Sequence, residues 1–161
     1  MVKKEIATFG AGCFWGVESL FLELNGVIST SVGYMGGNES YKNLNYEEVC
    51  TDETGHAEVV QIIYDSEKIN YKKLLEVFWN NHDPTTQDRQ GPDVGRQYRS
   101  VIFYHTDKQR KEAVKSKNDI QRKFGKVEVV TEIVKAGKFY KAEEYHQKYY
   151  KKKGIKPTCH Y

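Results

Sequence analysis

Proline and cysteine are both scarce in this chain of 161 residues, which contains only three of each. No apolar run approaches the roughly 20 residues that a membrane-spanning helix needs. The two lysines near the N-terminus are not followed by the apolar segment of a secretory signal. These absences predict a cytoplasmic protein without a membrane partner. Aromatic residues make up 13% of the chain, which excludes a disordered protein because disordered sequences contain few of them.

The three cysteines, Cys13, Cys50 and Cys159, are too few for a disulfide scaffold, and their number is odd. Neither a Cys-x-x-Cys nor a His-x-x-x-His pair occurs, so we expect no metal site. No glycine-rich nucleotide-binding loop follows a strand, and we expect no cofactor. We interpret Cys50 as buried and structural, because free cysteines are mostly buried.

The net charge of +3 hides an asymmetry between the two parts of the chain. Residues 1–104 contain 9 basic and 15 acidic residues, whereas residues 105–161 contain 16 and 7. A basic segment can bind nucleic acid. Here the lysines alternate with acidic residues along helix-like segments, which is typical of a solvated helix face. We therefore expect no nucleic-acid partner.

No Gly/Ser-rich linker and no internal repeat divides the sequence, and hydrophobic periodicity predicts strands that alternate with helices, so we expect a single α+β domain over residues 1–161. The order of its strands and helices is typical of a two-layer α/β sandwich with a ferredoxin-like split βαβ core. The catalytic core is expected over about 5–147, followed by an irregular C-terminal tail over about 148–161. Strands are predicted over 5–9, 27–34, 57–64, 100–104 and 127–134, helices over 17–24, 71–82, 107–123 and 142–150, a turn over 10–12, an irregular segment over 38–54 and a long loop over 83–97.

Cys13 follows a strand and a glycine turn and precedes the first predicted helix. The free N–H groups and the positive dipole end of a helix stabilise a thiolate, so this position predicts a lowered pKa for Cys13. Phe14 and Trp15 provide apolar surface beside the sulfur. Local sequence alone leaves a second interpretation open, in which Cys13 is a small buried hydrophobic residue.

The segment around Cys13 resembles the active-site signature of the peptide methionine sulfoxide reductase A (MsrA) family. The resemblance continues in the family's order through the chain and covers about residues 5–147. The matching segments are GCFWG at 12–16, GYMGG at 33–37, YEEVC at 46–50, TGHAE at 54–58, FWNNHDP at 78–84, RQGPDVG at 89–95, QYRS at 97–100 and AEEYHQ at 142–147.

The resemblance implies a thiol-dependent reductase of methionine S-sulfoxide, acting on proteins, peptides and the free amino acid. Cys13 matches the nucleophile. Because the departing oxygen must be protonated, the reaction needs an acid, and Glu58 matches that acid. Apolar neighbours would raise the pKa of Glu58 by desolvation. Without the resemblance, Glu58 could equally face solvent, because Val59 and Val60 do not determine its side.

The remaining implied site residues bind the two ends of the sulfoxide group. Tyr46 and Tyr98 match phenols that donate hydrogen bonds to the sulfoxide oxygen. Asp93 matches a residue that helps bind or orient substrate and water. Phe14 and Trp15 match the pocket for the S-methyl group. By themselves, two of twelve tyrosines and one aspartate in a turn could serve packing and turn geometry alone.

The resemblance also implies how the nucleophile is regenerated. Cys13 would become a sulfenic acid, which condenses with a second thiol. Cys159, two residues from the end of the sequence, matches the distal resolving cysteine of some family members. Thioredoxin or another dithiol would then reduce the Cys13–Cys159 disulfide.

Two other functions remain as alternatives. A thiol hydrolase would pair Cys13 with His56 or His82 as a base. A redox sensor would form a disulfide between Cys13 and Cys159 without turning over a substrate.

Overall fold

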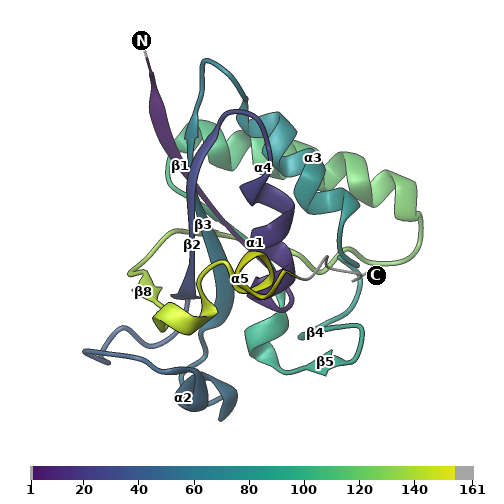
Figure 1. Ribbon diagram of the computed structural model, residues 1–161. Coiled ribbons are helices and arrows are strands. Elements are labelled where there is room, and N and C mark those ends of the chain that lie inside the picture. The colour runs from purple at the N-terminus through teal and green to yellow at the C-terminus, as the bar shows by residue number, and fades with distance from the viewer. Residues whose placement is uncertain (1, 155–161) are drawn as a thin grey trace.

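A six-stranded sheet forms the centre of the computed structural model, which describes residues 2–154 (Figure 1). The strand order is β7-β6-β1-β3-β2-β8, and a separate two-stranded sheet pairs β4 with β5. The strands are β1 (Lys4–Ala11), β2 (Val27–Met35), β3 (Ala57–Asp65), β4 (Arg89–Gln90), β5 (Asp93–Val94), β6 (Ser100–Tyr104), β7 (Glu132–Lys135) and β8 (Tyr140–Lys141).

Three of the helices begin at a side chain that accepts a hydrogen bond from the first turn. Asn45, Asn70 and Thr106 cap α2, α3 and α4 in this way, which satisfies N–H groups that have no partner within the helix. The helices are α1 (Phe14–Leu22), α2 (Tyr46–Cys50), α3 (Tyr71–Asn80), α4 (Asp107–Phe124) and α5 (Tyr149–Lys153), with short 3-10 turns η1 (Arg96–Tyr98) and η2 (Glu144–His146).

The central strands form two interlocked βαβ units. Strand β3 runs antiparallel to both β1 and β2, and β1 runs antiparallel to β6. The crossover through α1 therefore joins parallel strands that flank β3, and the crossover through α3 joins parallel strands that flank β1. This arrangement confirms the predicted α+β sandwich with a split βαβ core.

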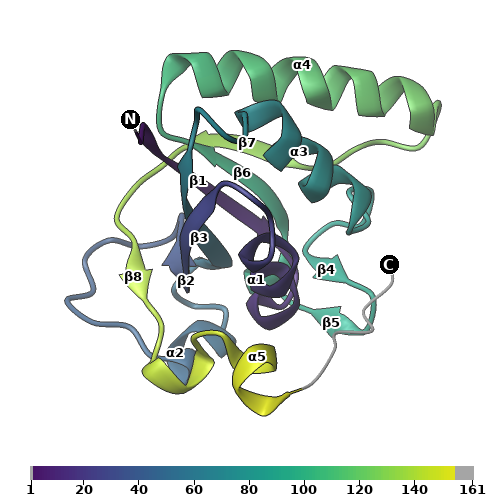
Figure 2. The same cartoon turned by 45° about the horizontal axis from the view of Figure 1, so that its top comes forward.

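The helices α1, α3 and α4 lie on one side of the sheet (Figure 2). Because strand side chains alternate between faces, Val60 and Ile62 share the helix-covered face with Phe9 of β1, in the larger core. Val59 belongs to the smaller core on the opposite face, with Phe103. Glu58 therefore points to the helix side of the sheet.

Several predicted boundaries are wrong. The predicted turn over 10–12 is largely strand, since β1 continues to Ala11. The segment 38–54 is not wholly irregular, because it contains α2, whose five residues are too few to show helical periodicity. The predicted strand 127–134 is reduced to Glu132–Lys135, because Val129 and Val130 donate their backbone hydrogen bonds to Gln121 and Pro84 rather than to the sheet.

The last predicted helix, over 142–150, is also wrong. It is divided into η2 and α5, and Lys148 between them adopts a left-handed φ of 51° that interrupts the helix. The predicted loop 83–97 contains the small β4–β5 sheet and the first two residues of η1.

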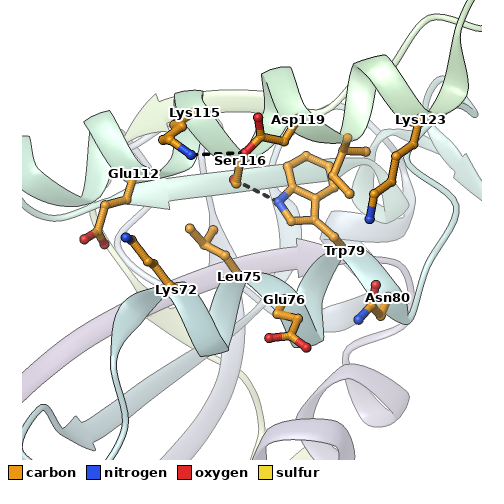
Figure 3. A pocket seen from close by; sticks show the side chains of 11 residues that line it. Lys72, Leu75, Glu76, Trp79, Asn80, Glu112, Lys115, Ser116, Asp119 and Lys123 are labelled. Carbon is orange, nitrogen blue, oxygen red and sulfur yellow. Dashed lines mark hydrogen bonds and ion pairs between the residues drawn. The ribbon is translucent and has the colours of Figure 1, made fainter.

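A groove of about 390 Å³ runs between α3 and α4 (Figure 3). Its floor includes Trp79, whose indole N–H donates a 2.9 Å hydrogen bond to Ser116, and Lys115 and Asp119 form an ion pair of 3.3 Å on its rim. None of its lining residues belongs to the predicted site. Across residues 2–154, none of the helices has both the length and the apolar character needed to cross a membrane.

Candidate active site

Strand pairing brings Cys13 and Glu58 together although 45 positions separate them. Phe9 of β1 pairs with Val60 of the antiparallel β3, so the chain leaving β1 passes Glu58. Gly10 permits this close approach, because a Cβ there would lie 3.1 Å from the backbone oxygen of Glu58 and 2.8 Å from Cγ1 of Val101. Cys13 is then the N-cap residue of α1.

Glu58 is held at both oxygens in a site that excludes water. Glu58 is only 1% exposed. Oε1 accepts a 3.2 Å hydrogen bond from the backbone N–H of Phe14, and Oε2 accepts a 2.8 Å bond from Nε2 of Gln97. Burial raises the pKa of Glu58 to about 7, although both hydrogen bonds lower it. The direction agrees with the sequence-based expectation, and a carboxyl with this pKa can hold a proton near neutral pH.

The expected lowering of the Cys13 pKa is wrong. Burial, followed by the charge of Glu58, raises the pKa of Cys13 to about 12. The backbone N–H groups of Trp15 and Gly16 do lower this pKa, as a helix N-terminus should, but their effect is smaller than the desolvation of the thiolate. Cys13 in the free protein is therefore a thiol.

Two tyrosines from separate segments meet beside the buried acid. Tyr46 begins α2 and Tyr98 ends η1, and their hydroxyl oxygens lie 3.5 Å apart. Burial raises the pKa of Tyr98 to about 12 and raises the pKa of Tyr46 still further. Both phenols therefore keep their protons at neutral pH and can donate hydrogen bonds to one acceptor.

Asp93 stands in β5, in the small sheet that precedes η1. Burial raises the pKa of this half-exposed carboxyl. Its charge in turn raises the pKa values of Cys13, Glu58 and Tyr98, so it lies within electrostatic range of all three. The fold thus brings Asp93 to the same site.

Aromatic rings from the two ends of the described chain pack beside Cys13. Phe14 is buried, and Trp15 is partly exposed and stacks on Tyr149 of α5, with ring centroids 3.7 Å apart. The indole N–H of Trp15 donates a 2.9 Å hydrogen bond to Nδ1 of His146. The His146 ring also lies 5.0 Å from the Tyr46 ring, so a row of aromatic rings joins Trp15 to the phenol pair.

Three residues of the site received no role from the sequence. They are Gln97, His146 and Tyr149. Gln97 and His146 lie in the matching segments QYRS and AEEYHQ, and this position could have marked them as site residues. Their residue types alone did not indicate which atoms they contact. Tyr149 lies just beyond the last matching segment.

The prediction that Cys50 is buried is wrong. Cys50 is the last residue of α2 and is exposed, whereas its neighbour Val49 provides the buried contact of that helix. Its Sγ accepts a 3.4 Å hydrogen bond from Nε2 of Gln97. Cys159 lies outside the described residues.

The two histidines that a thiol hydrolase would need, His56 and His82, form hydrogen bonds to groups other than Cys13. His56 contacts the backbone of Gly37 and Asn38 through its two ring nitrogens, at 3.0 and 2.9 Å. His82 contacts the carbonyl of Phe78 and the hydroxyl of Ser100, at 2.6 and 2.7 Å. Neither ring therefore has a nitrogen available to accept a proton from Cys13. Within residues 2–154 there is also no cluster of three side chains suited to a metal ion.

A family model described as "Peptide methionine sulfoxide reductase" matches residues 5–161. The chain belongs to this family. A curated relative, peptide methionine sulfoxide reductase MsrA of Methanosarcina mazei, is 58% identical over 152 residues, which are 94% of this chain and 71% of the relative. The chain is therefore a peptide-methionine (S)-S-oxide reductase of the A type, an oxidoreductase.

Solved structures of the family have the same fold. Reduced Mxr1 from Saccharomyces cerevisiae superposes with a TM-score of 0.91 at 40% identity, covering 99% of this chain and 92% of Mxr1. Mxr1 has also been solved in complex with Trx2, and that chain superposes with a TM-score of 0.63 at 30% identity, covering 91% and 85%. The reductase family thus accounts for both the sequence and the fold of this chain.

Proposed function

We propose that this reductase converts methionine S-sulfoxide to methionine with Cys13 as the nucleophile and Glu58 as the proton donor. Its substrates are methionine sulfoxide in proteins and peptides and the free amino acid. The observation that carries the proposal is the hydrogen bond from Phe14 to Glu58. It holds a buried carboxyl group, whose pKa is raised to about 7, at the residue that follows the thiol.

The first step transfers oxygen from the substrate to Cys13. Glu58 gives its proton to the sulfoxide oxygen while the Cys13 sulfur attacks the sulfoxide sulfur. A bond between the two sulfurs forms, and the Cys13 proton passes to the Glu58 carboxylate. The hydroxyl group then moves from the substrate sulfur to the Cys13 sulfur as the S–O bond and the S–S bond break, and one electron pair stays on the methionine sulfur. The products are methionine and a Cys13 sulfenic acid. The substrate sulfur gains two electrons and Cys13 loses two.

The remaining groups recognise the two ends of the sulfoxide. Tyr46 and Tyr98 donate hydrogen bonds to the oxygen as it becomes more negative, in the manner of an oxyanion site. Asp93 orients the substrate or a water molecule. Phe14 and Trp15 receive the S-methyl group, which contributes only about 1–3 kcal/mol of selectivity, so recognition of the oxygen carries much of the rest.

Cys159 resolves the sulfenic acid in the second step. Its thiol attacks the Cys13 sulfur, water leaves, and a Cys13–Cys159 disulfide forms. The stack of Tyr149 on Trp15 keeps the chain beside the site at Tyr149, which is ten positions before Cys159. Five positions separate Gly154 from Cys159, and five residues of chain span at most about 17 Å.

Thioredoxin then reduces this disulfide with its own pair of thiols. The solved complex of the relative Mxr1 with Trx2 supports this choice of reductant.

The deciding experiment measures turnover of the two separated epimers of a methionine sulfoxide peptide, with dithiothreitol as reductant. We expect reduction of the S epimer only, and its complete loss in Cys13→Ser. If a folded protein with a titratable Cys13 reduces neither epimer, the proposal fails and the redox sensor becomes the better interpretation.

A further inference from the structure

Gln97 joins the proposed acid to one of the proposed phenols. It is the middle residue of η1, next to Tyr98, and it is only 4% exposed. Its Nε2 donates to Oε2 of Glu58 at 2.8 Å, while the other carboxyl oxygen is held by the backbone of Phe14. The carboxyl group is thus fixed in orientation by two donors from different parts of the fold.

We infer that Gln97 is a positioning residue, which holds the Glu58 carboxyl toward Cys13 and stabilises its carboxylate form when the proton has passed to the substrate. This inference rests on the proposed role of Glu58 as the proton donor. It adds to that role a second group, which acts on Glu58 and not on the substrate.

The geometry supports this role because Glu58 is almost fully buried and has no bulk water to solvate its charge. A carboxylate in such a place depends on hydrogen bonds from the protein. Of the groups that lower the pKa of Glu58, the Gln97 amide has the largest effect and the Phe14 N–H the second. Without the amide, the acid would hold its proton more tightly and transfer it less readily.

Nε2 of Gln97 also lies 3.4 Å from Sγ of the exposed Cys50. The Gln97 amide therefore lies between the exposed Cys50 thiol and the buried Glu58 carboxyl group. The hydrogen bond to Glu58 is the shorter and stronger of the two. This placement favours a role directed at Glu58, because a hydrogen bond to a charged oxygen is stronger than one to a thiol.

The test replaces Gln97 by methionine, which has a similar length but no hydrogen-bond donor. Carboxyl ¹³C NMR titration of Glu58, assigned with Glu58→Gln, should show a midpoint raised above the wild-type value by roughly one pH unit, the size expected for a lost hydrogen bond to a charged group. At pH 6, where the acid holds its proton in both proteins, the first-turnover rate without reductant should fall by up to about tenfold.

Gln109→Met is the matched control, because Gln109 is also buried and donates its amide hydrogen bond to Ile6, in another part of the fold. It should leave the Glu58 midpoint unchanged. If Gln97→Met does not fold, Gln97→Asn keeps the amide but shortens the side chain, and it should shift the midpoint in the same direction.

The two hypotheses fail separately. An unchanged Glu58 midpoint in a folded Gln97 variant overturns the positioning role of Gln97. If instead Glu58→Gln reduces the S epimer at the wild-type rate, the proposed proton donor is wrong and the inference on Gln97 falls with it.

Discussion

The backbone N–H of Phe14 donates a 3.2 Å hydrogen bond to Oε1 of Glu58, and this contact joins the start of α1 to the middle of the sheet. Cys13 therefore cannot move far from the acid without breaking a buried hydrogen bond. The relationship depends on the register between β1 and β3, in which Phe9 faces Val60. The proposed nucleophile and acid are thus placed by the most central pair of strands.

Replacing Glu58 by glutamine should lower kcat/KM for the S epimer by roughly 10²- to 10⁴-fold, because the departing oxygen loses its proton donor. In the wild type, kcat/KM should fall as the pH rises through about 7, where Glu58 loses its proton. The residual activity of Glu58→Gln should lack this decline.

A control for this pH profile is Glu18→Gln. Glu18 is equally buried but contacts Thr30 and the backbone of Lys148. The Glu18 variant should retain the decline near pH 7, and its disappearance there would contradict the assignment to Glu58.

Removing either phenol should slow reduction by roughly 10²-fold, the effect of losing one hydrogen-bond donor to a developing negative charge. Because the hydroxyls of Tyr46 and Tyr98 lie 3.5 Å apart and serve one oxygen, we expect the losses in Tyr46→Phe and Tyr98→Phe not to add independently. Single-turnover rates of the two single variants and the double variant measure this coupling.

Tyr71→Phe is the control for loss of a tyrosine hydroxyl. Tyr71 is buried, and its hydroxyl oxygen has no hydrogen-bond partner among the described residues. This variant should keep wild-type activity and lose no stability, since no hydrogen bond is broken. Equal rates in Tyr46→Phe and wild type would refute the role of Tyr46.

Peptide mapping after one turnover without reductant should recover a Cys13–Cys159 disulfide. Cys50→Ser should form it at the same rate, because exposed Cys50 has no part in the proposed relay. In Cys159→Ser, the sulfenic acid should persist on Cys13 and be trapped by a 1,3-dione reagent. A Cys13–Cys50 disulfide in the wild type would assign resolution to Cys50 instead.

His82 should make the protein sensitive to acid. Burial lowers its pKa from the usual 6.5 to about 4, because the site does not solvate a charge, and this effect outweighs the hydrogen bond to the Phe78 carbonyl, which raises the pKa. The unfolded chain thus binds a proton below pH 6.5 that the folded protein does not. Through this group the free energy of unfolding falls by about 3 kcal/mol between pH 6.5 and 4.

Denaturant unfolding of wild type and His82→Gln across this range tests the acid sensitivity. The excess free energy of unfolding of the wild type over His82→Gln should shrink as the pH falls. Glu58, whose pKa is raised, contributes in the opposite direction, but it does so equally in both proteins and cancels in the comparison. NMR titration of His82 with a midpoint near 6.5 would show the prediction to be wrong.

The pattern of the sequence was sufficient for the four central strands β1, β2, β3 and β6 and for the long helices, whereas β8 was not predicted. Apolar spacing predicted α3, and the charged segment over 107–123 was predicted as the helix α4, both within two residues of their ends. The same reasoning missed α2, which is a single capped turn. It also extended β7 over Val129 and Val130, whose backbone N–H groups bond to Gln121 of α4 and to Pro84 instead. Local periodicity carries no information about which distant backbone completes a hydrogen bond.

The sequence by itself determined which chemical groups are available and their order: a cysteine at the start of a helix, a glutamate in a strand, two tyrosines and an aspartate in the segments between. Only the tertiary structure decided that Glu58 faces the helices, that Gln97 holds it, that Cys50 is exposed, and that the pKa of Cys13 is raised. The physical reason is that burial and the field of nearby charges depend on segments far apart in the chain. For Cys13, desolvation by those segments outweighs the local effect of the helix N-terminus.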